Sequence, residues 1–115
     1  MNKTDTYTTK RGGTLVIVNG YRGEKDFYRM HDIINKLLAP ETSGFSVDAM
    51  CVGGYFRKNN LLIRTSSESP YDYISFYYDP AAMTEEELVM IRAWIDTVVD
   101  EMHTVHAPVF VTDDF

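Results

Sequence analysis

The chain has 115 residues, of which 44% are hydrophobic and 24% charged; these proportions are typical of one globular domain and exclude an intrinsically disordered protein. The net charge of −6 is unevenly distributed, since residues 1–64 carry ten of the eleven Lys and Arg and sum to +4, whereas residues 65–115 sum to −10. If the fold keeps these halves apart, each surface attracts partners of opposite charge; if it interleaves them, the charges only favour solubility.

The first elements that the pattern predicts are a strand and a helix. The β-branched apolar run at 14–19 predicts a strand buried on both faces. The glycines in the segment 20–23 predict a turn. A helix is expected from about Glu24 to Leu38, because apolar residues recur along one face at helical spacing, and Pro40 then ends it.

A meander of three strands is expected next, over residues 45–52, 61–65 and 71–78. The first strand alternates, with Phe45 and Cys51 among the residues that point toward the core, and Gly53-Gly54 predicts a bulge or bend after it. Asn59 and Asn60 predict a tight turn, since Asn tolerates the left-handed backbone. The segment 66–70 is expected to be a polar loop.

The third strand carries five aromatic residues between Tyr71 and Tyr78. At the period of two that a strand imposes, Ile74, Phe76 and Tyr78 point to one side, which we assign to the core. The other side carries Tyr71, Tyr73, Ser75, Tyr77 and Asp79. A row of tyrosine and serine is typical of a half-solvated surface, and a second packed layer or a dimer partner would explain it equally well.

The last helix is expected from Thr84 to about His103. Thr84 and Glu87 match a capping box, and Met83 with Leu88 matches the hydrophobic staple that accompanies it. The apolar stripe consists of Leu88, Ile91, Ile95, Val98, Val99 and Met102.

The element order is therefore strand, helix, three strands and helix, with a short strand at Val109–Thr112. Two amphipathic helices can cover one face of such a sheet, which predicts a two-layer α+β fold with an antiparallel or mixed sheet. The opposite face should be partly solvated. We expect a flexible N-terminal arm over residues 1–12, a single domain over 13–112 and an acidic tail over 113–115.

Membrane association and secretion are not expected. No apolar run approaches the roughly 20 residues of a membrane-spanning helix, and the run at 15–18 is shorter than the ~7–15-residue apolar core of a secretory signal. The single cysteine excludes an internal disulfide and fits a reducing compartment, so we expect a cytoplasmic protein.

No motif specific for catalysis, metals or nucleotides is present, so we expect no catalytic residue, metal or cofactor. The segment 20–23 lacks the third glycine of a dinucleotide-binding loop. His31 and Cys51 lie on elements predicted to be buried, where a packing role is expected. His103 and His106 could share a helix face, but the sequence offers no specific third ligand for zinc.

The element order over about residues 24–103 resembles that of double-stranded-RNA-binding domains. That family presents lysines to phosphate at the start of its last helix, where this chain has Glu85, Glu86 and Glu87. Because these carboxylates would repel phosphate, we do not expect a nucleic-acid partner. A basic patch elsewhere would draw on Lys10, Arg11, Arg22, Arg57, Lys58 and Arg64.

The last helix is apolar on more than one side, because Val89, Met90, Ala93 and Trp94 lie opposite the core stripe. Aromatic residues and Met are enriched in interface cores. We therefore expect Met90 and Trp94 to anchor a partner, with a homodimer as one form of that interface.

The leading hypothesis is a non-catalytic interaction protein that presents an acidic, tyrosine-bearing surface to a basic surface of a partner protein. In size, charge and element order the chain resembles phage-encoded anti-defence inhibitors and immunity proteins that neutralise toxins. The expected partner-binding residues are Glu68, Asp72, Tyr73, Tyr77, Asp79, Glu85, Glu86, Met90 and Trp94. Carboxylates would steer the association, and the tyrosines would supply contact area at low entropy cost.

Two other classes remain open. One is a small metal-binding or ligand-binding enzyme that uses His31 or the pair His103 and His106. The other is a self-associating structural protein, in which the basic N-terminal half of one copy meets the acidic C-terminal half of another.

Overall fold

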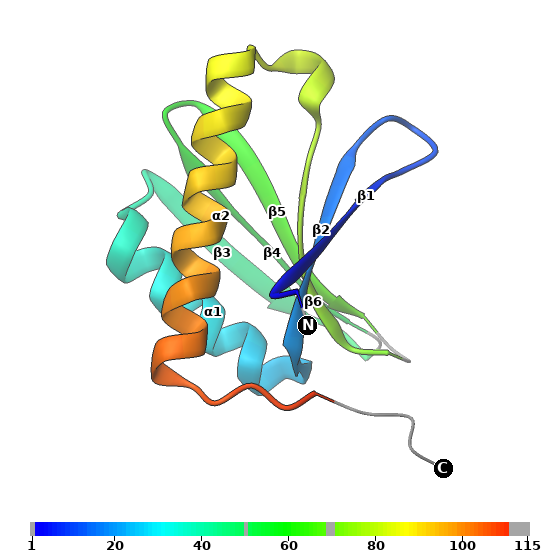
Figure 1. Cartoon of the computed structure of the whole chain (residues 1–115), viewed down its shortest axis with the longest axis vertical. Helices are drawn as coiled ribbons and strands as arrows, with labels where there is room; N and C mark the ends of the chain where they lie inside the picture. Colours follow the sequence, from blue (N-terminus) through cyan, green and yellow to red (C-terminus); the bar gives the residue numbers. More distant parts are fainter. Residues whose placement is uncertain (1, 50, 69–70, 111–115) are drawn as a thin grey trace.

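The computed structural model describes residues 2–49, 51–68 and 71–110, which form an antiparallel sheet with two helices packed on one of its faces (Figure 1). The elements in chain order are β1 Thr4–Thr8, β2 Thr14–Arg22, α1 Gly23–Leu38, β3 Thr42–Val47, β4 Cys51–Lys58, β5 Leu61–Glu68, β6 Tyr73–Tyr78, the 3-10 helix η1 Pro80–Ala82, and α2 Glu85–Val105. The six strands follow the order β1-β2-β6-β5-β4-β3 across the sheet. The predicted two-layer α+β fold is confirmed.

The N-terminal segment differs from the flexible arm expected over residues 1–12. Thr4–Thr8 forms the edge strand β1, which pairs with β2 from Thr4↔Val18 to Thr8↔Thr14. β1 is also tied to α2, because the Arg92 guanidinium donates to the hydroxyls of Thr4 and Thr6 at 2.9 and 3.0 Å. Its threonines favour a strand, and these long-range contacts supply the order that composition alone did not predict.

The prediction of one strand over 45–52 is wrong, because the chain reverses direction within this segment. β3 ends at Val47 and β4 begins at Cys51, so the two halves pair with each other in the register Val47↔Val52. Asp48 stabilises the reversal by accepting a hydrogen bond from the backbone amide of Cys51 at 3.0 Å. Gly53 and Gly54 lie inside β4 in continuous register rather than at a bulge.

Three further boundaries differ from the sequence prediction. β2 continues through the expected turn at 20–23 as far as Arg22, with a register shift between Val18 and Arg22. β5 extends through most of the predicted loop, to Glu68. Val109 donates one backbone hydrogen bond to Gly20 at 2.8 Å, but neither Val109 nor Phe110 lies in a strand. The rest of that predicted strand, and the acidic tail at 113–115, lie outside the described residues.

The core lies between the helices and one face of the sheet, here called the covered face. The predicted core residues Ile74, Phe76 and Tyr78 of β6 are all buried there, which confirms the assigned face of that strand. The largest fully buried side chains from the other strands and the helices are Phe27, Met30, Ile34, Phe56, Ile63, Ile91, Ile95 and Met102. Phe45 was predicted to be core but stays 51% exposed, since edge strand β3 places it at the rim beside α1.

The capping box at the start of α2 is present as predicted. The Thr84 hydroxyl accepts a hydrogen bond from the Glu87 amide at 3.1 Å, and the Glu87 carboxylate accepts one from the Thr84 amide at 2.9 Å. Met83 and Leu88 both pack against the core beside this cap. These contacts fix where α2 begins and hold its N-terminal end beside η1.

Replacing Thr84 by Ala removes the hydroxyl that caps α2. We expect the free energy of unfolding to fall by about 1 kcal/mol, measured by urea denaturation. Thr97→Ala is the control, because the Thr97 hydroxyl donates to the Ala93 carbonyl within the helix and satisfies no orphan amide. Equal decreases in the free energy of unfolding of the two variants would contradict the capping role of Thr84.

Candidate functional site

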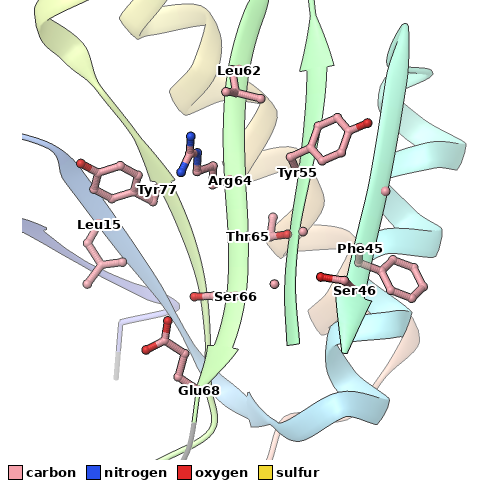
Figure 2. Close-up of a pocket in the computed structure, with 13 residues that line it drawn as sticks. Leu15, Phe45, Ser46, Tyr55, Leu62, Arg64, Thr65, Ser66, Glu68 and Tyr77 are labelled. Carbon is pink, nitrogen blue, oxygen red and sulfur yellow. The ribbon is translucent and has the colours of Figure 1, made fainter. Parts of the chain in front are cut away.

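The face of the sheet opposite the helices, here called the open face, is hollowed into a groove (Figure 2). The main hollow has a volume of about 930 Å³ and extends across β2, β6, β5, β4 and β3. A second hollow of about 440 Å³ adjoins it and shares Leu62, Arg64 and Tyr77 with it. Together they form one groove that runs from Glu68 to Asp79 and the residues of η1.

The floor of the groove is a row of small side chains on adjacent strands. Ser75 of β6 lies opposite Ser66 of β5, Ser66 lies opposite Gly53 of β4, and Gly53 lies opposite Ser46 of β3. The hydroxyls of Ser66 and Ser75 are 2.8 Å apart and hydrogen-bonded. Because facing positions on adjacent strands share one side of the sheet, Ser66, Gly53 and Ser46 leave a depression there, and Ser75 continues the row beyond the residues that line the hollow.

A row of larger side chains forms the neighbouring wall. It consists of Leu15, Tyr77, Arg64 and Tyr55, each opposite the next on adjacent strands. The Tyr77 ring lies over Gly13, where a Cβ atom would collide with it, and the Tyr55 ring lies 3.3 Å from the position of a Cβ on Gly44. The two rings therefore lean away from each other and leave Arg64 uncovered between them (Figure 2).

The charged groups of the groove are separated along β5. Arg64 is exposed, and its guanidinium makes no hydrogen bond or ion pair with any described residue. Glu68 lies four residues further along the same face, about 13 Å away at the rise of a β-strand. Neither side chain takes part in an ion pair among the described residues, so each charge is available to a ligand.

A buried polar pair lies directly beneath the floor. On the covered face, His31 Nε2 and the Thr65 hydroxyl are hydrogen-bonded at 2.7 Å, and His31 is 2% exposed. Burial lowers the pKa of His31 to about 4, although the neighbouring Asp32 carboxylate acts in the opposite direction. A Cβ on Gly54 would lie 2.8 Å from the Thr65 hydroxyl and 2.9 Å from His31 Nε2. Glycine at position 54 therefore gives this pair its space.

Cys51 is the first residue of β4 and is half-buried, not in the core as the sequence predicted. The β4 alternation places it on the open face, opposite Glu68. Desolvation, together with the hydrogen bond from its thiol to Asp48, raises the pKa of Cys51. A thiol with a raised pKa is a poor nucleophile at neutral pH.

The predicted partner-binding residues fall in four places. Glu68 and Tyr77 line the main hollow, and Asp79 lines the second one. Glu85 and Glu86 are exposed in the first turn of α2, just beyond η1. Asp72 and Tyr73 lie at the start of β6, where Tyr73 is opposite Glu68 of β5 and the Arg22 guanidinium lies 4.9 Å from the Tyr73 ring centre. The fourth place is the outer side of α2.

Met90 and Trp94, on that outer side, already have contacts within the chain. The Lys58 ammonium lies 5.9 Å from the Trp94 ring centre, and the Met90 sulfur accepts a hydrogen bond from the Asn59 side chain at 3.3 Å. Trp94 also packs against the core. These contacts cover part of the surface that the sequence assigned to a partner.

His103 and His106 do not converge on a common site. The His103 ring makes an edge contact with Tyr21 and lies near Phe110, while the His106 carbonyl accepts a hydrogen bond from the Tyr21 hydroxyl at 2.6 Å. Burial is the main cause that lowers the pKa of His103. Across the described residues, no three His, Cys, Asp or Glu side chains are grouped closely enough to hold a metal ion.

Comparison with protein-family models, curated proteins and solved structures found no match to this chain. Neither helix in the described part of the chain combines the length and apolar character that crossing a membrane requires.

Sequence reasoning missed the groove floor and Tyr55, and it named Arg64 only as part of a basic patch for a nucleic-acid partner. The strand pattern held a partial signal, because β5 alternates buried residues with Leu62, Arg64, Ser66 and Glu68. The missing information was the pairing register, which alone places Gly53, Ser66 and Ser75 in one line.

The two adjacent glycines of β4 provide a matched test of the floor. Gly54→Ala should destabilise the protein by about 1–3 kcal/mol, because its Cβ meets Thr65, His31 and the Gly44 carbonyl oxygen. Gly53→Ala should leave stability unchanged or raise it slightly, since a Cβ there has no atom within 4 Å. Thermal unfolding of both variants measures the difference, and equal stabilities would contradict the described packing.

His31 should make stability depend on pH. Its folded-state pKa of about 4 lies below the ordinary value of 6.5, so the unfolded chain binds the proton more readily. The free energy of unfolding should fall as pH decreases from about 6.5 to about 4 and lose this dependence below that range.

Urea denaturation across that pH range measures the effect. His31→Gln should flatten the slope, although His103 will retain part of it. If the pH dependence of stability is unchanged in His31→Gln, His31 is not its source.

Proposed function

We propose that the protein is a non-catalytic binding module of the inhibitor type, which receives a segment of a partner protein in the open-face groove and thereby blocks a basic surface of that partner. The observation that carries the proposal is the continuity of the two hollows through Leu62, Arg64 and Tyr77. A long, shallow groove fits a polypeptide segment better than a small molecule, which binds where most of its surface is buried.

Charge at the ends of the groove favours a cationic segment. Glu68 lies at one end and Asp79 at the other, and the exposed Glu85 and Glu86 extend the negative surface beyond η1. Such carboxylates raise the rate at which a basic surface associates. Tyr55 and Tyr77 supply rigid contact area with few rotatable bonds.

The chemistry of the nearby reactive groups supports a non-catalytic role. The pKa of Cys51 is raised, which disfavours its thiolate. The imidazole of His31 is buried on the covered face, and its pKa is lowered to about 4. Neither group is therefore suited to nucleophilic or acid–base work in the groove at neutral pH.

Self-association through Met90 and Trp94 is the weaker alternative, because contacts with Asn59 and Lys58 occupy part of that surface. Homodimer formation and a cytoplasmic location both stay predictions. Sedimentation of a Trp94→Asp variant tests the first, and an unchanged mass would argue against Trp94 as the anchor.

Filling the groove tests the proposal directly. Gly53→Leu adds a side chain at the floor without backbone strain, because the position has open space and no left-handed φ. In affinity purification from the host, the Gly53→Leu variant should no longer capture the host protein that binds the wild-type chain. Ala93→Leu adds the same side chain on the exposed surface of α2 and should retain it.

The partner identified in this way is then purified, and its binding to each variant is measured by calorimetry. We expect at least tenfold weaker binding for Gly53→Leu, on the order of 1.4 kcal/mol. Glu68→Gln combined with Asp79→Asn should slow association and reduce its dependence on salt. Equal affinities of the Gly53→Leu and wild-type proteins would rule out the groove as the binding surface.

A further inference from the structure

Among the described residues that line the groove, Arg64 is the one charged side chain of its central part, between the carboxylates at the two ends. Every residue directly beside it is uncharged: Tyr77 and Tyr55 lie opposite on β6 and β4, and Leu62 and Ser66 flank it on the same face of β5. The nearest acid on that face of the strand is Glu68, about 13 Å away. Its guanidinium is thus left with all five N–H donors unused within the described structure.

Two glycines keep this guanidinium uncovered. The tyrosine rings beside an arginine often stack on it, but here the Tyr77 ring lies down over Gly13 and the Tyr55 ring over Gly44. Neither ring covers Arg64 (Figure 2). The hollow between them is also lined by Ser66 and by Gly53, which is opposite Ser66 on β4. The site therefore presents an uncovered cation above an uncharged floor of small residues.

The donors around this opening favour an anion. The Arg64 guanidinium supplies these donors, while the Tyr55 and Tyr77 hydroxyls point away over Gly44 and Gly13 and the Ser66 hydroxyl is hydrogen-bonded to Ser75. A planar guanidinium binds carboxylate or phosphate through two parallel hydrogen bonds. The flat tyrosine rings and the glycine at position 53 offer an apolar surface beside that anion.

We propose that Arg64 forms an anion-binding subsite that takes a carboxylate or phosphate located next to an apolar, preferably aromatic, group. In the proposed complex this subsite receives an acidic group located between the basic residues of the partner segment, so this role deepens the proposed function and rests on it. The recognition of a simple aromatic anion does not depend on the identity of the partner.

The test uses defined probes and two-dimensional NMR of the full chain. Benzoate, phenyl phosphate and inorganic phosphate are titrated separately, and shifts of the Arg64 side-chain N–H and of the Gly53 and Ser66 amides are followed. The two aromatic probes should bind at this position, and inorganic phosphate should bind more weakly, because it lacks the apolar group. Tighter binding of benzoate than of phenyl phosphate assigns the site to carboxylates, and the reverse order assigns it to phosphate.

Matched variants separate this site from general charge effects. Arg64→Gln should weaken binding of the aromatic probes by about tenfold or more. Arg64→Lys should weaken their binding by less, since it keeps the positive charge but loses the planar guanidinium. Lys25→Gln is the control, because Lys25 is exposed on α1, on the other side of the sheet, and its loss should leave binding unchanged. Equal binding by wild type and Arg64→Gln, or no shifts with any probe, would overturn the proposal.

A fourth titration with a short thymidine oligonucleotide distinguishes this proposal from the proposed function. If the oligonucleotide binds more tightly than phenyl phosphate and Arg64→Gln abolishes its binding, the anion subsite stands and the protein-partner proposal fails. If the aromatic probes do not bind but Gly53→Leu still loses the protein partner, the subsite fails and the proposed function stands.

Discussion

Burial of one sheet face beneath α1 and α2 determines which side chains of this protein are available for binding. Because strand side chains alternate, each of the strands β2, β4, β5 and β6 contributes one set of residues to the core and the other set to the open face. Phe56, Ile63 and Phe76 are thereby removed from solvent, while Tyr55, Arg64 and Tyr77 are left on the surface of the groove. The site is a direct consequence of the fold's two-layer architecture.

Glycine acts on both sides of the same strand. Gly54 makes room on the covered face for the His31–Thr65 hydrogen bond, and Gly53 contributes to the depression on the open face. Gly13, in the turn between β1 and β2, and Gly44, on β3, allow the Tyr77 and Tyr55 rings to lie down on either side of Arg64. The groove therefore owes its shape to missing side chains as much as to those that line it, and the exposed charge of Arg64 follows from that shape.

The sequence predicted the elements that depend on local patterns and missed those that depend on pairing. The apolar stripe and capping box of α2, the helix α1 and the buried side of β6 are all present, because each is encoded within a few residues. The strand β1 was missed because its polar threonines become a strand only beside β2 and α2. The reversal at Asp48 was missed because it depends on the pairing of β3 with β4. For the same reason, Tyr77 and Glu68 were identified as candidate site residues, whereas Tyr55 was not and Arg64 was assigned only to a separate basic patch.

Photo-crosslinking tests most directly whether the open face is the binding surface. A p-benzoylphenylalanine residue is placed at Tyr55, inside the groove, or at Val89, which is 71% exposed on α2. Both proteins are irradiated in the native host, and the crosslinked products are identified by mass spectrometry. We expect a discrete crosslink to one partner protein from position 55 and none from position 89. A crosslink to one partner from position 89 alone would place the interface on α2 and contradict the account.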